Sequence, residues 1–165
     1  RYEGVLVDYY YQGMQKKLGL TTHEADDNQL AFSLLDILMK NNMDYTRSFR
    51  ALSHVSKTDS LCALRDDCLD RETFDKWFQQ YSARLQRETI TDNQRQQQMQ
   101  AINPKFILRN YLAQIAIEKS EKGDFSELDT LLMLLQSPFA EHPDYERYAD
   151  LPPDWGQDLE ISCSS

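Results

Sequence analysis

The sequence predicts an all-α fold: an antiparallel array of helices followed by an irregular C-terminal tail. Apolar residues recur about every 3.6 positions along most of the chain, which is the period of a helix face. Glycine and proline number 5 each among 165 residues, too few for a loop-dense all-β domain. We therefore expect one helical domain over residues 1–138, with a tail over residues 139–165 packed on it.

Two helices are expected before residue 42. The first runs from Tyr2 to Leu18 and stops at Gly19, because glycine readily takes the left-handed conformation that ends a helix. Thr21 and Glu24 have the spacing of a capping box, so the second helix is expected to start there. Its apolar face repeats every four residues, at Leu30, Leu34 and Leu38.

Aspartates mark the next two helix starts. Asp44 is expected to cap a short third helix, and residues 56–69 are expected to form a loop with a short helix. Asp70 opens the clearest helix of the chain, whose apolar stripe is Phe74, Trp77, Phe78, Tyr81 and Leu85. Burying each of these five would contribute about 2 kcal/mol before entropy. We expect the stripe to be core, with a groove for a partner helix as the alternative.

Further start signals divide the rest of the chain. Thr91 with Gln94 predicts another capping box, ahead of a polar helical face at residues 94–100. Asn103-Pro104 predicts a helix start, because Asn caps and Pro suits the first helical position. That helix is expected to end at Gly123. Asp124 and Glu127 are then expected to frame a last helix that stops at Ser137-Pro138, and Tyr145, Tyr148 and Trp155 can pin the tail onto the helices.

The charge balance excludes some partners. Lys plus Arg number 18 and Asp plus Glu 27, so the formal net charge is −9 and neither nucleic acid nor an anionic membrane surface is an expected partner. No apolar run approaches the roughly 18 residues of a membrane span. Three cysteines are an odd number, which favours a reducing compartment. The chain begins at Arg1, so we expect it to be a piece of a longer protein.

Motifs for catalysis are scarce. No two of the five glycines have the spacing of a phosphate-binding loop, so the residues alone show no recognisable nucleotide site. Asp26-Asp27 and Asp66-Asp67 are adjacent pairs whose side chains would point about 100° apart on a helix, and solvated faces explain them best. A stand-alone metal site is a remote alternative to simple burial, built from His54, Cys62, Asp66 and Cys68.

Cys163 lies third from the C-terminus, in a short polar tail. A cysteine in such a tail is expected to be accessible, and nearby Asp158 and Glu160 would raise its pKa slightly. Taken alone, this position is as consistent with chance as with a redox role.

Several segments resemble one protein family in the same order. They are KLGL at 17–20, DYT at 44–46, WF at 77–78, NPKFILRNYLAQ at 103–114, GDFSEL at 123–128, LPPDW at 151–155 and CSS at 163–165. Together they are similar to the selenoprotein O (SelO/YdiU) family, and to its C-terminal helical region in particular. The resemblance spans essentially the whole chain.

The resemblance implies an activity for a longer parent protein. SelO-type proteins are kinase-like (pseudokinases) and transfer AMP from ATP to Ser, Thr or Tyr hydroxyls of proteins, with Mg²⁺ or Mn²⁺; UMP transfer is also attributed to bacterial members. The nucleotide- and metal-binding residues of the family map onto no position here, so ATP, metal and catalysis are expected in the upstream kinase-like region, the chain's main partner. Cys163 takes the position of a family selenocysteine or regulatory cysteine, which implies a redox-regulatory role.

Two alternatives stay open at this stage. The chain is expected to act in the bacterial cytoplasm, or in mitochondria if it is eukaryotic. An acidic helical array that exposes an aromatic stripe would also suit a non-catalytic interaction module that binds a partner protein.

Overall fold

The computed structural model describes residues 2–156, with residues 2–6 and 8 described by their backbone alone. Within this range the chain forms helices and short connecting segments without a strand, which confirms the all-α prediction there. It divides into two compact units, Arg1–Asn103 and Pro104–Ser165. This division differs from the predicted boundary at residue 138, because Tyr148 of the tail belongs to the same core as the last two α-helices. The antiparallel array and the likeness to a kinase stay predictions.

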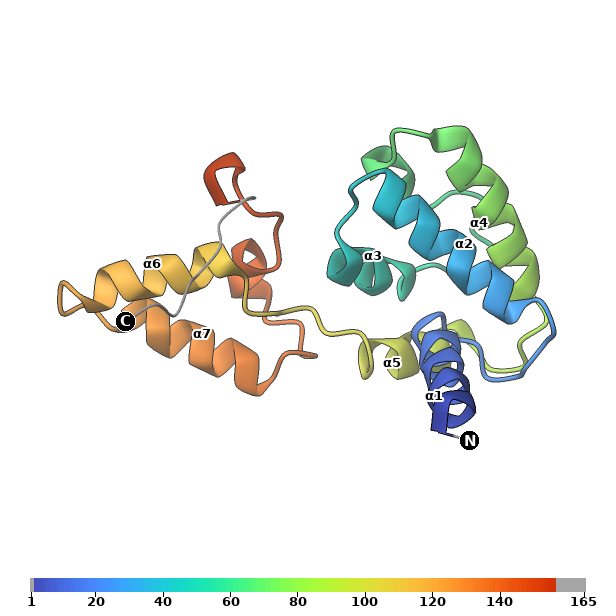
Figure 1. The fold of residues 1–165 in the computed structure, drawn as a ribbon, viewed down its shortest axis with the longest axis horizontal. Coiled ribbons are helices and arrows are strands. Elements are labelled where there is room, and N and C mark those ends of the chain that lie inside the picture. Colours follow the sequence, from blue (N-terminus) through green and yellow to red (C-terminus); the bar gives the residue numbers. More distant parts are fainter. Residues whose placement is uncertain (1, 157–165) are drawn as a thin grey trace. The chain divides into compact units, whose positions relative to one another are not determined.

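Five α-helices and a short 3-10 helix build the first unit (Figure 1). They are α1 (Tyr2–Lys17), α2 (Asp27–Lys40), α3 (Tyr45–Leu52), η1 (Ala63–Asp67), α4 (Arg71–Leu85) and α5 (Asp92–Gln100). Three predicted caps are confirmed: Asp44, Asp70 and Thr91 each accept a hydrogen bond from a backbone N–H of the first turn that follows. These caps satisfy N–H groups that have no partner within the helix.

Gly19 ends the first helix, as predicted. Its φ is +72°, the left-handed region that favours glycine. A Cβ at this position would lie 2.6 Å from Met99 Sδ and 2.8 Å from Arg95 Cγ. The turn after α1 therefore needs glycine both for its backbone conformation and for the close approach of α5.

The predicted start of the second helix at Thr21 is wrong, since α2 begins at Asp27. The Thr21 and Thr22 hydroxyls donate to the carboxylate of Glu88 instead of closing a capping box. At the actual start, the Glu24 backbone N–H donates to Asp27 Oδ2 over 2.8 Å. A partner distant in sequence thus replaces the local one.

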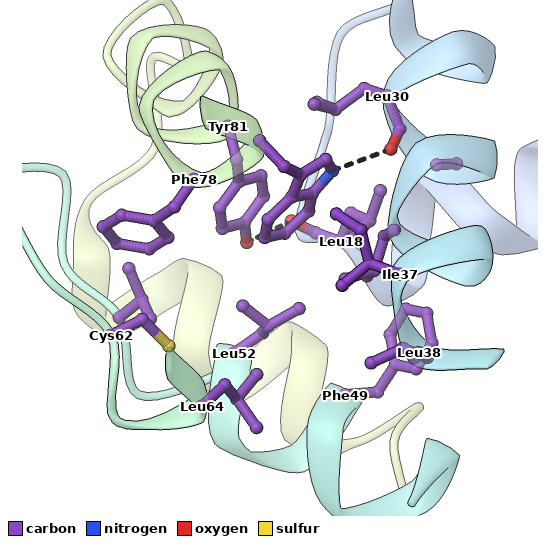
Figure 2. Packing of buried hydrophobic residues seen from close by; sticks show 14 of the residues in the cluster. Leu18, Leu30, Ile37, Leu38, Phe49, Leu52, Cys62, Leu64, Phe78 and Tyr81 are labelled. Atoms are coloured by element: carbon purple, nitrogen blue, oxygen red, sulfur yellow. Dashed lines mark hydrogen bonds between the residues drawn. The ribbon is translucent and has the colours of Figure 1, made fainter. Parts of the chain in front are cut away.

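The aromatic stripe of α4 forms the core of the first unit. Phe74, Trp77, Phe78, Tyr81 and Leu85 are each at most 3% exposed. Trp77 Nε1 donates to the Leu30 carbonyl over 2.9 Å, and the Tyr81 hydroxyl donates to the Leu18 carbonyl over 2.8 Å (Figure 2). The prediction that this stripe is core is confirmed, and the alternative of a partner groove on it is excluded.

The second unit contains a helical hairpin, α6 (Asn110–Ser120) and α7 (Ser126–Gln136), followed by the 3-10 helices η2 (Pro143–Tyr148) and η3 (Asp154–Gly156) (Figure 1). The predicted helix start at Asn103-Pro104 is wrong. Residues 104–109 are not helical, because the backbone N–H groups of Lys105 and Phe106 both donate to the Pro138 carbonyl, over 2.8 and 3.1 Å. The Asn103 side chain donates to the Lys17 carbonyl and caps no helix of its own.

Asp124 and Glu127 frame the start of α7, as predicted. Asp124 Oδ1 accepts from the Ser126 backbone N–H over 3.0 Å, so it supports the turn before the helix. Glu127 lies inside the first turn, is buried, and pairs with Lys119 of α6 over 3.0 Å. Glu127 therefore joins α7 to α6 through an ion pair.

The described part of the tail packs on the hairpin. Tyr148 is 3% exposed and shares a core with Phe106 and Leu134. The ring of Trp155 stands edge-on to Tyr111, with 6.0 Å between centroids. None of the helices in residues 2–156 combines the length and the apolar character that crossing a membrane requires.

Candidate functional site

A buried ionic cluster joins the loop before α2 to the C-terminal end of α4. Arg84 Nε lies 2.6 Å from Asp27 Oδ1, and Arg84 Nη1 lies 2.8 Å from Glu88 Oε1. The side chains of Arg84, Asp27 and Glu88 are 3%, 1% and 0% exposed. One guanidinium therefore bridges two carboxylates away from solvent, a geometry that Arg supports because its donors form a planar fork.

Threonines complete this cluster. Glu88 accepts from the hydroxyls of Thr21 and Thr22, and from the Thr22 backbone N–H over 3.2 Å. Burial alone would raise the pKa of Glu88, but the hydrogen bonds from Thr21 and Thr22 outweigh burial and lower the pKa to about 2. The Glu88 carboxylate is therefore ionised at neutral pH and is a poor candidate for a general acid or base.

The cluster has a structural role in the first unit. Arg84 also donates to the Thr22 carbonyl over 2.7 Å, so each partner of the guanidinium is a group of the same unit. The sequence reasoning missed this cluster, because it assigned Asp26-Asp27 to a solvated face. That expectation is correct for Asp26, which is exposed, and wrong for Asp27. The i, i+4 spacing of Arg84 and Glu88 beside the apolar stripe was the available signal.

The alternative metal site of His54, Cys62, Asp66 and Cys68 does not form among the described residues. No group of three His, Cys, Asp or Glu side chains in residues 2–156 has the geometry of a metal centre. The His54 ring contacts Gln96 and Gln100, and Cys68 Sγ donates to the Asp70 carbonyl over 3.3 Å. Asp66 is exposed and lies 3.7 Å from Arg71. These side chains have separate local partners and do not converge on one point.

Cys62 and Cys68 are buried free thiols, as the simpler interpretation predicted. Burial raises the pKa of both thiols. Their reactive thiolate form is therefore scarce at neutral pH. Cys163, the predicted redox-regulatory residue, lies outside the described residues.

The second unit carries an open apolar groove of about 560 Å³ between α6 and α7. Leu108, Ile117, Leu128 and Leu132 line it and are 54%, 45%, 48% and 55% exposed. The structure leaves this stripe of the hairpin uncovered within the described chain.

These features define a class: a two-unit helical protein with a buried ionic cluster and an apolar surface groove. Comparison with known families then places the chain. The family model for "Protein adenylyltransferase SelO" matches residues 1–136. The chain belongs to this family, so the predicted resemblance is confirmed.

Relatives with assigned names are similar over almost the whole chain. The protein nucleotidyltransferase YdiU of Yersinia pseudotuberculosis serotype O:1b (strain IP 31758) is 50% identical over 164 residues, 99% of this chain. YdiU of Salmonella schwarzengrund (strain CVM19633) is 47% identical over 165 residues, 100% of this chain. In each case the match covers 34% of the relative, so the chain spans about a third of the length of these proteins. That this third is the C-terminal one stays a prediction.

Proposed function

We propose that this chain is the supporting, non-catalytic helical part of a longer protein nucleotidyltransferase. The parent would transfer AMP from ATP to Ser, Thr or Tyr hydroxyls of proteins, with UMP transfer as a second activity. In this reaction the hydroxyl oxygen attacks the α-phosphorus. The bond from that phosphorus to the bridging oxygen breaks, pyrophosphate leaves, and the hydroxyl proton passes to a base.

One observation carries the supporting role. Arginine and carboxylate side chains bind phosphate or metal in other proteins. Here Arg84 is buried and pairs with the buried carboxylates of Asp27 and Glu88. A phosphate would have to break this cluster to reach Arg84, at the cost of leaving two buried carboxylates unpaired. We therefore assign ATP and Mg²⁺ or Mn²⁺ to the part of the parent outside this chain.

We also propose a regulatory role for Cys163 and a cytoplasmic location. The two cysteines in the described range are buried, with raised pKa values, which makes them poor redox partners. A disulfide of Cys163 would therefore form with a cysteine elsewhere in the parent. Disulfide mapping of the parent after oxidation tests this: a link from Cys163 to Cys62 or Cys68 would contradict it.

The experiment that tests the supporting role compares the parent with the 165-residue chain. Each is incubated with ATP, Mg²⁺ or Mn²⁺ and a generic acceptor protein, and intact masses are measured. We expect an AMP adduct with the parent and none with the chain alone. An adduct produced by the chain alone would place an active site in these helices and end the proposal. A parent that modifies no acceptor and not itself would contradict the transferase activity.

A second candidate, a protein-interaction module, is favoured by the apolar groove between α6 and α7. The groove is a specific surface that the first candidate must also account for. The two candidates differ in what covers it: another part of the same protein, or a separate partner.

A further inference from the structure

The groove is built from two parallel rows of apolar side chains. Leu128, Leu132 and Leu135 follow one another at i, i+4 and i+7 along α7, and Ala113 and Ile117 stand at i and i+4 along α6. Rows at these spacings form the ridges between which a third helix packs. The shape of this surface therefore suits the apolar stripe of an amphipathic helix.

The exposure of this surface is unusual for a chain that functions alone. Leu108, Leu128 and Leu132 are each about half exposed, and all three line the same groove. Single exposed apolar residues are common on proteins, but a contiguous patch marks an interaction site.

The charge of the second unit restricts the occupant further. Residues 104–165 contain 5 Lys and Arg against 12 Asp and Glu, so this unit carries −7 of the net charge of −9. Glu121 lies on the lining of the groove itself. A helix with basic residues beside its apolar stripe would match this surface in charge as well as in shape.

We propose that the groove between α6 and α7 is occupied by a basic amphipathic helix from the part of the same protein that lies outside this chain. This inference rests on the proposed function, in which the chain supports the rest of a longer parent. Its relatives are about three times as long as this chain, so the parent holds ample sequence to supply such a helix. Docking within one molecule also needs no second binding partner, because the effective concentration of a tethered segment is high.

Photocrosslinking in the parent protein tests this occupant. Leu132 is replaced with p-benzoyl-phenylalanine (Leu132→p-benzoyl-phenylalanine), and the linked peptides are identified by mass spectrometry. Asp129 is the matched control position, because it is an exposed residue of α7 that does not line the groove. We expect links from position 132 to a Lys- or Arg-rich peptide outside residues 1–165, on the same molecule and well above the yield from position 129.

Three results would overturn the proposal: a covalent dimer, a link to residues 157–165, or a yield no higher than at position 129. They indicate a second copy, the tail of this chain, or an uncovered groove. Hydroxyl-radical oxidation of the unsubstituted parent is the second measurement, because it leaves the groove without the bulky probe. Leu132 and Leu151 are 55% and 51% exposed here. In the parent we expect Leu132 to be oxidised at least about tenfold more slowly than the reference residue Leu151, since a covered side chain reacts only on local opening. Equal rates would overturn the proposal.

The transferase assay on the same preparation separates the two proposals. An active parent without the crosslink leaves the proposed function standing and removes only the occupant. An inactive parent with the expected crosslink supports the docking and removes the activity.

Discussion

Arg84 and Asp27 form an ion pair of 2.6 Å whose two side chains are 3% and 1% exposed. The pair joins α4 to the first residue of α2, across a long separation in sequence. Buried ion pairs add little compared with a packed apolar core, but breaking one leaves a charge without compensation. The fold of the first unit therefore depends on Arg84 more than its position at a helix end suggests.

Replacing this arginine should destabilise the first unit strongly. Arg84→Met removes the guanidinium and leaves Asp27 and Glu88 unpaired, so we expect the free energy of unfolding to fall by about 3–5 kcal/mol. Arg87→Met is the matched control, because Arg87 is 54% exposed and its ion pair with Glu24 is exposed to solvent, where such pairs contribute little to stability. Equal losses for the two variants would contradict the role assigned to Arg84.

Urea unfolding followed by tryptophan fluorescence measures this difference. The two tryptophans lie in different units, Trp77 in the first and Trp155 in the second. A Trp155→Phe background therefore makes the fluorescence report the first unit alone. The midpoint for Arg84→Met should shift to lower urea, with the slope unchanged.

The stability of the first unit should depend on pH through Glu88. Its pKa is about 2 in the folded chain, against an ordinary value of 4.5. A depressed pKa contributes stability that is present above pH 4.5 and is lost as the pH falls towards 2. We expect the difference in unfolding free energy between the unsubstituted chain and the Glu88→Gln variant to narrow by about 3 kcal/mol over this window.

The control for this pH dependence is Glu72→Gln. Glu72 is 80% exposed and pairs with Lys76, one turn along α4. The unfolding free energy of this variant should follow that of the unsubstituted chain from pH 5 to pH 2. If the Glu88→Gln difference stays constant over the same range, the hydrogen bonds from Thr21 and Thr22 do not hold the carboxylate ionised.

Three glycines separate backbone strain from steric contact. Gly19 and Gly123 both have positive φ, but only at Gly19 would a Cβ meet neighbouring atoms. Gly123→Ala should cost about 1–2 kcal/mol from conformation alone, and Gly19→Ala should cost clearly more. Gly13→Ala, in the middle of α1 with open space around it, should stabilise by about 0.5–1 kcal/mol. Thermal or urea unfolding of the three variants measures this order, and equal costs at Gly19 and Gly123 would contradict it.

Local signals explain which parts of the fold were predictable. The caps at Asp44, Asp70 and Thr91 need only the following turn, so their sequence spacing is sufficient. Thr21 and Pro104 carry equally good local signals and fail. The hydroxyl of Thr21 finds Glu88, and the residues after Pro104 bond to the Pro138 carbonyl. A long-range partner overrode the local preference in both cases.

The candidate site was less predictable than the fold. Periodicity correctly marks the apolar faces of α6 and α7, but it says nothing about which part of a face the same chain covers. Leu131 and Leu134 are buried while Leu128 and Leu132, on the same helix, are exposed. Sequence alone likewise left Asp26 and Asp27 equivalent, and only the position of Arg84 distinguishes them.

The cysteines provide a last prediction, which bears on the regulatory proposal. Burial raises the pKa values of Cys62 and Cys68, and Cys68 also donates to a backbone carbonyl. In a Cys163→Ser chain we expect both thiols to react with a thiol reagent at least about tenfold more slowly when folded than in urea. The unsubstituted chain should show one additional, fast-reacting thiol. A fast thiol that survives Cys163→Ser would mean that a buried cysteine is the reactive one, and the regulatory role would have to move to it.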